Sequence, residues 1–285
     1  MIFLVGPLGW QQLPLLEGLK AQDNILYGID DDKNAVGKNL CNEIVPYKFS
    51  QINEILRFFD SRDVLDQLII LPLVSDVATK YFSALEFKIG KAEKIISQCF
   101  FNKAELNRVL LDNGLTNKKL WQNSKDKNGD WVVKPREGSG SRNVSFITIQ
   151  NNEQPIRLEE DCVIEERIMG DELSIDGYVY DSELEFLVSQ RDLYKSKTAR
   201  RIYPKQLDKT EIQALLNKFL KGAGYSRGIF HIEMIKSGTR LEIIDAAARV
   251  GGILANNDFP YQFLMENMQI QNNLIDSSLK LGIEK

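Results

Sequence analysis

The stretch WVVKPREGSGSRNV, residues 131–144, decides how the rest of the chain is interpreted. The apolar run from Trp131 to Val133 predicts a buried strand, and the strand ends at Lys134 and Pro135. Small residues follow, and apolar alternation then resumes at Val144. The pattern predicts a hairpin with a lysine at the root of a flexible tip, whose backbone N–H groups can close over phosphate oxygens. The tip contains Gly138, Ser139, Gly140 and Ser141. An ordinary hairpin with a flexible turn is the alternative.

The composition is that of a globular protein, with 43% hydrophobic and 27% charged residues among 285. The net charge of −4 provides no general attraction to nucleic acid or to an anionic membrane. We therefore expect neither as a partner, and any anion site must be local.

Three cysteines lie far apart and lack metal-site spacing, which favours a reducing, cytoplasmic environment. The amino terminus has no basic leader and too short an apolar run for a signal or a spanning helix. With His231 as the one histidine, and no serine or cysteine in a nucleophile context, histidine-based catalysis is not expected.

The first part of the chain predicts a small α/β domain over residues 1–92. Strands are expected at residues 2–5, 24–29, 43–45 and 68–73, with helices at 11–20 and 51–61. This order predicts parallel strands. A dinucleotide-binding site is the more specific functional interpretation of this domain. However, the sequence Gly-Pro-Leu-Gly-Trp departs from the glycine fingerprint of such sites, and Pro7 and Leu8 would crowd a pyrophosphate.

Two basic features precede and follow the hairpin. Lys103 falls in the first turn of a helix predicted at residues 102–113, with Asn102 as its cap. A lysine there is unfavourable for the helix dipole, and a solvated surface lysine is the alternative. The second feature is the segment 191–205, which either meets an anionic substrate or is a solvated charge run. Its arginines are Arg191, Arg200 and Arg201.

A second hairpin is predicted from strands at residues 230–235 and 241–245, joined at Ser237-Gly238. Pairing across this turn can place Glu233 and Asp245 on one face, where oxygen-only ligation suits magnesium. Two separate surface acids are the alternative. Arg249 then leads into Gly251 and Gly252, where a ligand can approach the backbone and a guanidinium supplies charge.

Taken together, these motifs resemble the ATP-grasp superfamily, most closely its carboxylate–amine ligases, and the resemblance spans nearly the full chain. Lys134 resembles the phosphate-contacting lysine of that family and Lys103 its partner lysine. VIEERIMGDELSID resembles the family's hinge, with Glu165 implied as the adenine acid and Glu172, seven positions later, as the ribose acid. The implied backbone contacts come from Glu166, Arg167 and Ile168.

The resemblance also assigns roles at the second hairpin. Glu233 and Asp245 fall where the family places its metal-bridging acids, and Arg249 falls on the arginine of its E-x-N-x-R ending. Two departures are visible: Asn143 replaces a usual glycine, and Ala247 replaces the usual asparagine after an aspartate in place of glutamate. Glu242 is a weaker substitute ligand.

The resemblance implies an ATP-grasp fold with an N-terminal Rossmann-like domain (1–92), a central subdomain (93–165) and a C-terminal subdomain (166–285). It implies ATP and one or two Mg2+ ions, with Mn2+ as an alternative. The implied reaction activates a carboxylate as an acyl phosphate and joins it to an amine, with Lys134 and Arg249 acting on the reacting groups. The small amino-acid ligases of this family, such as the lysine–methylornithine and tyramine–glutamate ligases, favour amino-acid substrates.

Several alternatives stay open. Carboxylation, hydroxyl phosphorylation and a non-catalytic ATP-binding module would all retain the nucleotide site. Arg191, Arg200, Arg201 and His231 are candidates for the acceptor pocket, together with the glycine pair Gly251 and Gly252. A homodimer is left open.

Overall fold

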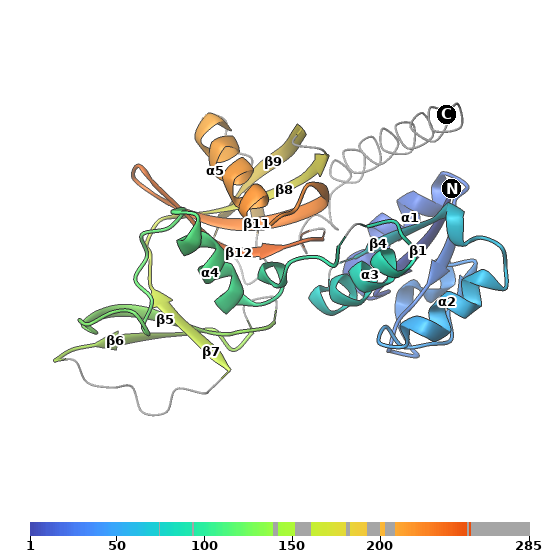
Figure 1. Cartoon of the computed structure of the whole chain (residues 1–285), viewed down its shortest axis with the longest axis horizontal. Helices are drawn as coiled ribbons and strands as arrows, with labels where there is room; N and C mark the ends of the chain where they lie inside the picture. Colours follow the sequence, from blue (N-terminus) through green and yellow to red (C-terminus); the bar gives the residue numbers. More distant parts are fainter. Residues whose placement is uncertain are drawn as a thin grey trace. The chain divides into compact units, whose positions relative to one another are not determined.

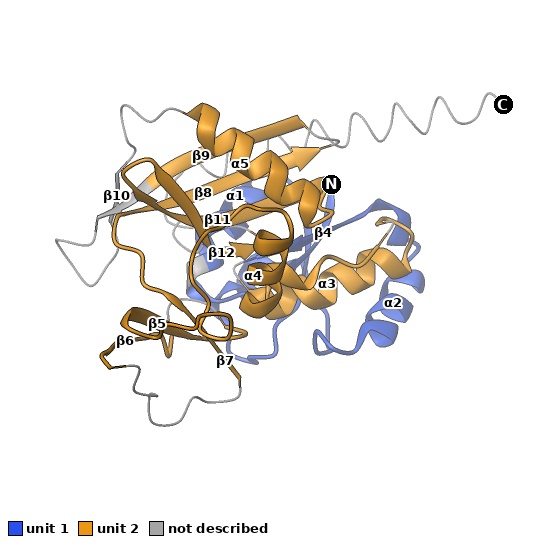
Figure 2. Cartoon of the chain, turned by 60° about the vertical axis from the view of Figure 1, so that its left-hand side comes forward, with its two compact units in different colours: residues 1–74, 251–285 blue, residues 75–250 orange. Residues whose placement is uncertain are grey.

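The computed structural model describes residues 1–73, 75–92, 94–138, 142–151, 161–180, 183–192, 200–202, 209–249 and 251. It divides into two compact units, Met1–Val74 with Gly251–Lys285, and Ser75–Val250 (Figure 2). The domain boundaries at residues 92 and 165 stay predictions.

Unit 1 contains a four-stranded parallel sheet in the order β3-β2-β1-β4. Its elements are β1 (Ile2–Gly6), the 3-10 helix η1 (Trp10–Gln12), α1 (Leu13–Ala21), β2 (Ile25–Gly28), η2 (Val36–Leu40), β3 (Glu43–Ile44), α2 (Ile52–Asp60), η3 (Leu65–Gln67) and β4 (Leu68–Pro72). Phe3, Leu4 and Val5 are fully buried, because a central parallel strand is covered on both faces. The predicted βαβ arrangement is confirmed.

The loops after β1 and β2 satisfy polar groups between them, because Asp30, which follows β2, accepts two backbone hydrogen bonds. Asp30 Oδ2 accepts a hydrogen bond from the Leu8 N–H (2.6 Å), and Asp30 Oδ1 accepts one from the Asp32 N–H (2.7 Å). The acid that a dinucleotide would need for its ribose is therefore engaged by backbone N–H groups of the loops after β1 and β2, which gives a physical reason against the dinucleotide alternative.

Unit 2 contains two antiparallel sheets, β6-β5-β7 and β10-β9-β8-β11-β12. Its elements are α3 (Asp76–Lys88), η4 (Gln98–Phe100), α4 (Lys103–Asp112), β5 (Gly129–Pro135), β6 (Ser145–Ile149), β7 (Cys162–Glu166), β8 (Asp171–Tyr180), β9 (Glu183–Asp192), β10 (Arg200–Ile202), α5 (Lys209–Gly222), β11 (Arg227–Ser237) and β12 (Arg240–Ala247). The predicted first hairpin is β5–β6, in which Trp131 pairs with Ile147.

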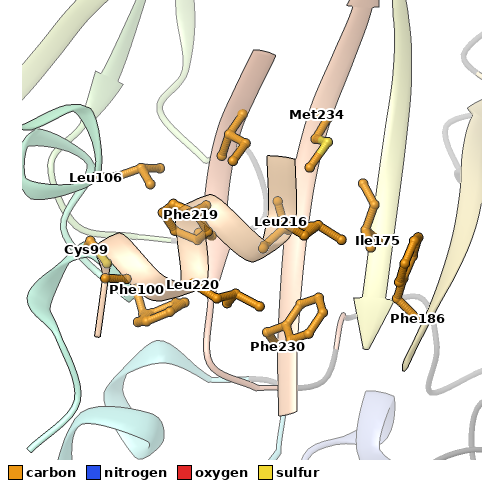
Figure 3. Close-up of a cluster of buried hydrophobic side chains, with 14 of the residues drawn as sticks. Cys99, Phe100, Leu106, Ile175, Phe186, Leu216, Phe219, Leu220, Phe230 and Met234 are labelled. Carbon is orange, nitrogen blue, oxygen red and sulfur yellow. The ribbon is translucent and has the colours of Figure 1, made fainter. Parts of the chain in front are cut away.

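Helix α5 covers one face of the larger sheet (Figure 1). Its buried residues recur at helical spacing and meet alternate residues of β11, with Leu216 and Phe219 packed beside Phe230 and Met234 (Figure 3). The β11 residues between these core positions point to the other face of the sheet and are therefore available for a role outside this core.

The β11–β12 hairpin contains a β-bulge. Glu233 pairs with Asp245, but the next residue, Met234, pairs with Ile243, so Ile244 is the extra residue. The bulge keeps Ile243 in the core and lets both Ile244 and Asp245 line a cavity on the other side.

Two further points concern membrane-spanning helices and the carboxyl-terminal segment. Among the described residues, no helix has the length and apolar character needed to cross a membrane. Apolar residues in the sequence predict a short helix at residues 254–263, followed by a carboxyl-terminal helix, and both segments lie outside the described residues.

Candidate functional site

Unit 2 encloses a cavity of about 490 Å³ between the β5–β6 hairpin, the segment after β7 and the bulged β11–β12 hairpin. Ten of the candidate site residues predicted from the sequence line it. They are Lys103, Lys134, Gly138, Glu165, Glu166, Arg167, Ile168, Glu172, Glu233 and Asp245.

Lys103 reaches this cavity from the start of α4. The side chain of Asn102 accepts hydrogen bonds from the N–H groups of Ala104 and Glu105, which fixes the first turn. Lys103 Nζ donates to the Gly138 carbonyl (2.8 Å) and lies 3.7 Å from Asp245 Oδ1. Its side chain is 13% exposed, so the solvated surface-lysine alternative is wrong.

Lys134 and Glu165 lie on the same face of the small sheet. Val132 pairs with Glu165, and Lys134 follows two residues later, so strand alternation points both side chains to one side. Lys134 Nζ contacts Glu165 Oε1 and also donates to the carbonyl of the bulge residue Ile244 (3.3 Å). The predicted phosphate lysine and the predicted hinge acid therefore touch each other.

A third lysine completes this group. Lys118 Nζ lies 2.8 Å from Glu165 Oε2, and it donates to the Ile243 carbonyl (3.2 Å). Burial alone would raise the pKa of Glu165, but Lys118 and Lys134 outweigh burial and lower the pKa to about 2. Glu165 is therefore ionised at neutral pH between two buried ammonium groups.

Glu233 and Asp245 oppose each other directly across β11 and β12. Burial raises the pKa of Asp245, and the charge of Glu233 raises it further, whereas Lys103 and Lys134 lower it; the net shift is upward. Opposed carboxylates that repel one another fit a divalent cation, and their oxygens are the ligands that Mg2+ prefers. No cluster of three or more His, Cys, Asp or Glu side chains suited to a metal occurs within the described part of the chain.

The segment after β7 forms a partly apolar end of the cavity. Ile168 and Met169 line it, together with Phe146 from β6, whose ring lies 4.4 Å from the Arg167 guanidinium. Phe146 is 60% exposed. An exposed aromatic ring beside backbone N–H and C=O groups offers a surface on which a flat heterocycle can stack.

Arg249 and His231 are absent from the cavity lining. Arg249 is buried, and its Nε lies 2.6 Å from Asp76 Oδ1 at the start of α3. His231 is buried against Asp176, with 2.7 Å between Nδ1 and Oδ1. Burial lowers the pKa of His231, but Asp176 and Glu233 raise it more, and the resulting pKa is about 9.

Glu242 is likewise not a cavity residue. It is buried and accepts hydrogen bonds from Thr116 Oγ1 (2.5 Å) and Arg240 Nε (2.9 Å). Because these partners engage both of its oxygens, Glu242 ties the chain before β5 to β12 and does not serve as a substitute metal ligand.

The remaining predicted residues cannot be placed at the site. Gly251 is buried and belongs to unit 1. The backbones of Arg191, Arg200 and Arg201 belong to β9 and β10, while their side chains are outside the description. Also outside the described residues are Ser139, Gly140, Ser141 and Gly252.

Sequence reasoning missed Lys118 and Asp76. Lys118 stands next to the exposed Lys119 in a short stretch without helical or strand periodicity, so no pattern distinguishes the buried lysine from its neighbour. Asp76 meets a residue 173 positions away, and one sequence contains no signal for such a contact.

Comparison with curated proteins finds only short similarities. A stretch of 40 residues is 52% identical to the probable GDP-L-fucose synthase 1 of Oryza sativa subsp. japonica, covering 14% of this chain and 12% of that protein. The chain thus spans roughly an eighth of the length of the curated relatives that it matches, and so short a match assigns no family.

Solved structures resemble most of the chain. An L-amino acid ligase from Bacillus licheniformis superposes with a TM-score of 0.67 at 17% identity, covering 88% of this chain and 67% of that one. N5-carboxyaminoimidazole synthetase from Staphylococcus aureus, complexed with ADP, gives 0.63 at 15% identity, covering 88% and 70%. At these identities the similarity shows the fold.

The family follows from the sequence match. The family model described as ATP-grasp domain matches residues 101–252, which is more than half of the 285 residues and includes every cavity-lining position named above. This protein belongs to the ATP-grasp family.

Proposed function

We propose that this protein is an ATP-dependent ligase that activates a carboxylate as an acyl phosphate and joins it to an amine, releasing ADP and phosphate. The observation that carries the proposal is the single cavity in which Lys103 and Lys134 face the opposed acids Glu233 and Asp245. Cations for phosphate oxygens and a carboxylate pair for a metal are the parts that phosphoryl transfer needs.

In this proposal the apolar end of the cavity holds the adenine. The ring would lie near Phe146, with the backbone of Glu166 and Ile168 at its polar edge and Glu172 at the ribose. Glu165 would act mainly by holding Lys134, because both of its oxygens already contact lysines.

The phosphates would lie toward β11 and β12. Lys103 and Lys134 would neutralise their oxygens, helped by the N–H groups of the loop 138–141. Glu233 and Asp245 would hold Mg2+, which when bound supplies positive charge to the phosphate oxygens.

The chemistry would proceed in two displacements. An oxygen of the substrate carboxylate attacks the γ-phosphorus, the bond from phosphorus to the ADP oxygen breaks, and an acyl phosphate forms. The amine nitrogen then attacks the acyl carbon, inorganic phosphate leaves, and the nitrogen loses a proton to solvent. Arg249 is the candidate for orienting the carboxylate, with Asp76 fixing one edge of its guanidinium.

Amino acids are the proposed substrates, and the similarity to an L-amino acid ligase supports this class. Cys41, Cys99 and Cys162 form no disulfide bond, which is consistent with the cytoplasmic location that we propose. Arg191, Arg200, Arg201, Gly251 and Gly252 remain predictions for the acceptor pocket.

The test is ADP release over a panel of amino-acid pairs. We expect release to require an amine, and Lys134→Ala and Asp245→Ala each to lower its rate by about 10²-fold or more, because each removes charge next to the transferring group. Lys119→Ala, at an exposed neighbouring lysine, is the matched control and should retain the rate. Near-normal turnover in both site variants would exclude the assignment.

Two other functions keep the same nucleotide site. Ala247 in place of the usual asparagine and Asn143 in place of the usual glycine favour a nucleotide-binding module without turnover. ATP binding with no ADP release over the whole panel would identify it. Hydroxyl phosphorylation, in contrast, would release ADP without any amine, and carboxylation would require bicarbonate for ADP release.

A further inference from the structure

We infer that Lys118 is a positioning residue for nucleotide binding: by holding Glu165, it leaves the charge of Lys134 available to the phosphates. The inference rests on the proposed function and adds a residue that the sequence motifs did not identify. It also explains why a lysine is buried where an apolar side chain would be expected.

The geometry is a three-membered ion cluster in the wall of the cavity. Glu165 lies between two lysines, with Oε2 against Lys118 and Oε1 against Lys134. The side chains of Lys118 and Glu165 are 1% and 3% exposed, whereas that of Lys134 is 11% exposed. Lys134 is therefore the member of the cluster most open to the cavity.

The charges of this cluster do not cancel. Two ammonium groups and one carboxylate leave a net charge of +1. A buried excess charge is costly unless an anion approaches it. Without Lys118, Lys134 and Glu165 would form a neutral pair and the attraction for phosphate would fall.

The chain around Lys118 is fixed on both sides. Lys118 N–H donates to Thr116 Oγ1 (3.1 Å), and Thr116 Oγ1–H donates to Glu242 on β12. The backbone of residues 119–121 pairs with β7, because Glu166 N–H donates to the Lys119 carbonyl (2.8 Å) and Trp121 N–H donates to the Ile164 carbonyl (3.0 Å). Lys118 is thus held against Glu165 by two strands.

If Lys118 positions Glu165 in this way, the affinity for Mg·ATP should increase with the net charge of the cluster. The charge is +1 in the wild type, 0 in Lys118→Met, +2 in Glu165→Gln and again +1 in the double variant. Adenosine has no phosphates, so its affinity should not follow this series. A merely structural role for Lys118 would weaken ATP and adenosine together.

The experiment is isothermal titration of the full chain with Mg·ATP and, separately, with adenosine. We expect Lys118→Met to lower the affinity for Mg·ATP by at least about tenfold, because the variant removes one buried unit charge several ångströms from the phosphates. The affinity for adenosine should change by less than about twofold. The double variant Lys118→Met/Glu165→Gln should recover Mg·ATP affinity to within about threefold of wild type. Lys119→Met, at the adjacent exposed lysine, is the control.

Folding of each variant is checked by thermal unfolding. If Lys118→Met does not fold, Glu165→Gln is compared with the double variant, because these two proteins also differ by the one charge of Lys118. The affinity for Mg·ATP should fall by the same factor between them. Lys118→Arg, which keeps the charge, should retain Mg·ATP affinity to within a few-fold.

The outcomes separate the two proposals. Suppose that the wild-type protein binds Mg·ATP. If Lys118→Met then has an unchanged affinity for Mg·ATP, or loses affinity for Mg·ATP and for adenosine equally, the role of Lys118 is overturned and the proposed function stands. Failure of the double variant to recover also overturns the role of Lys118. Wild-type protein that binds no nucleotide overturns both.

Discussion

The loops after β1 and β2 in unit 1 and the cavity of unit 2 both combine strand ends, small residues and acids, yet they use their polar groups differently. In the two loops, Asp30, which follows β2, accepts hydrogen bonds from the Leu8 N–H of the loop after β1 and from the Asp32 N–H of its own loop. In the second, Lys118 and Lys134 share one carboxylate, Glu165, in the wall of a cavity of about 490 Å³.

The difference shows what a sequence motif leaves undecided. A loop whose donors and acceptors satisfy one another gains stability and has little to offer a ligand. A cluster with excess charge next to open space costs stability and attracts an anion. The comparison therefore predicts that mutations in the two regions affect stability and binding in different proportions.

The largest effect is expected at Glu165. Glu165→Leu leaves Lys118 and Lys134 buried without a counter-charge and should lower the free energy of unfolding by about 3–5 kcal/mol, measured by urea denaturation. The control is Glu43→Leu, which breaks the exposed ion pair with Arg62 and should cost less than about 1 kcal/mol. Equal losses in the two variants would remove the distinction between the cavity cluster and an ordinary surface pair.

A smaller effect is expected at Asp30, which links the loops after β1 and β2 in unit 1. Asp30→Ala removes the acceptor of two backbone N–H groups and should lower the free energy of unfolding by about 1–2 kcal/mol, while Mg·ATP affinity stays unchanged. Asp31→Ala, at the exposed neighbouring acid, is the matched control for stability. A loss of Mg·ATP affinity in Asp30→Ala would show that the loop takes part in nucleotide binding and would break the comparison.

The smallest effect is expected at the start of α4. Asn102→Ala removes the cap of the turn that carries Lys103 and should cost about 1 kcal/mol of unfolding free energy. Mg·ATP affinity should fall a few-fold, because Lys103 loses its fixed position. Asn102→Asp, which keeps a capping oxygen, should restore both quantities, and a variant Asn102→Ala with full stability and affinity would rule out the cap as the positioning element.

Much of the fold could be predicted because local patterns and core burial agree. The apolar run of β1, the helical spacing in α5 and the alternation in β11 each match the face that the structure buries. The short turn also places Glu233 and Asp245 near each other on neighbouring strands, but their direct opposition depends on the bulge, because a regular ladder continued from the turn would pair Glu233 with Ile244.

Other parts of the site depend on contacts that a local pattern does not encode. The bulge at Ile244 exposes a carbonyl to Lys134, although alternation alone predicts a regular ladder. The role of Arg249 toward a substrate carboxylate stays a prediction, and the contact of its guanidinium with Asp76, 173 positions away, could not be inferred from a local pattern. His231 was expected in an acceptor pocket, and it instead lies buried beside Asp176, its partner in the β8–β11 register.

The most direct test of the central claim is a crystal structure of the chain with ADP and Mg2+. We expect the phosphates to contact Lys103 and Lys134, the metal to be bound by Glu233 and Asp245, and the adenine to lie beside the backbone of residues 166–168. A nucleotide bound elsewhere on the molecule, with these lysines and acids making no contact to it, would contradict the account.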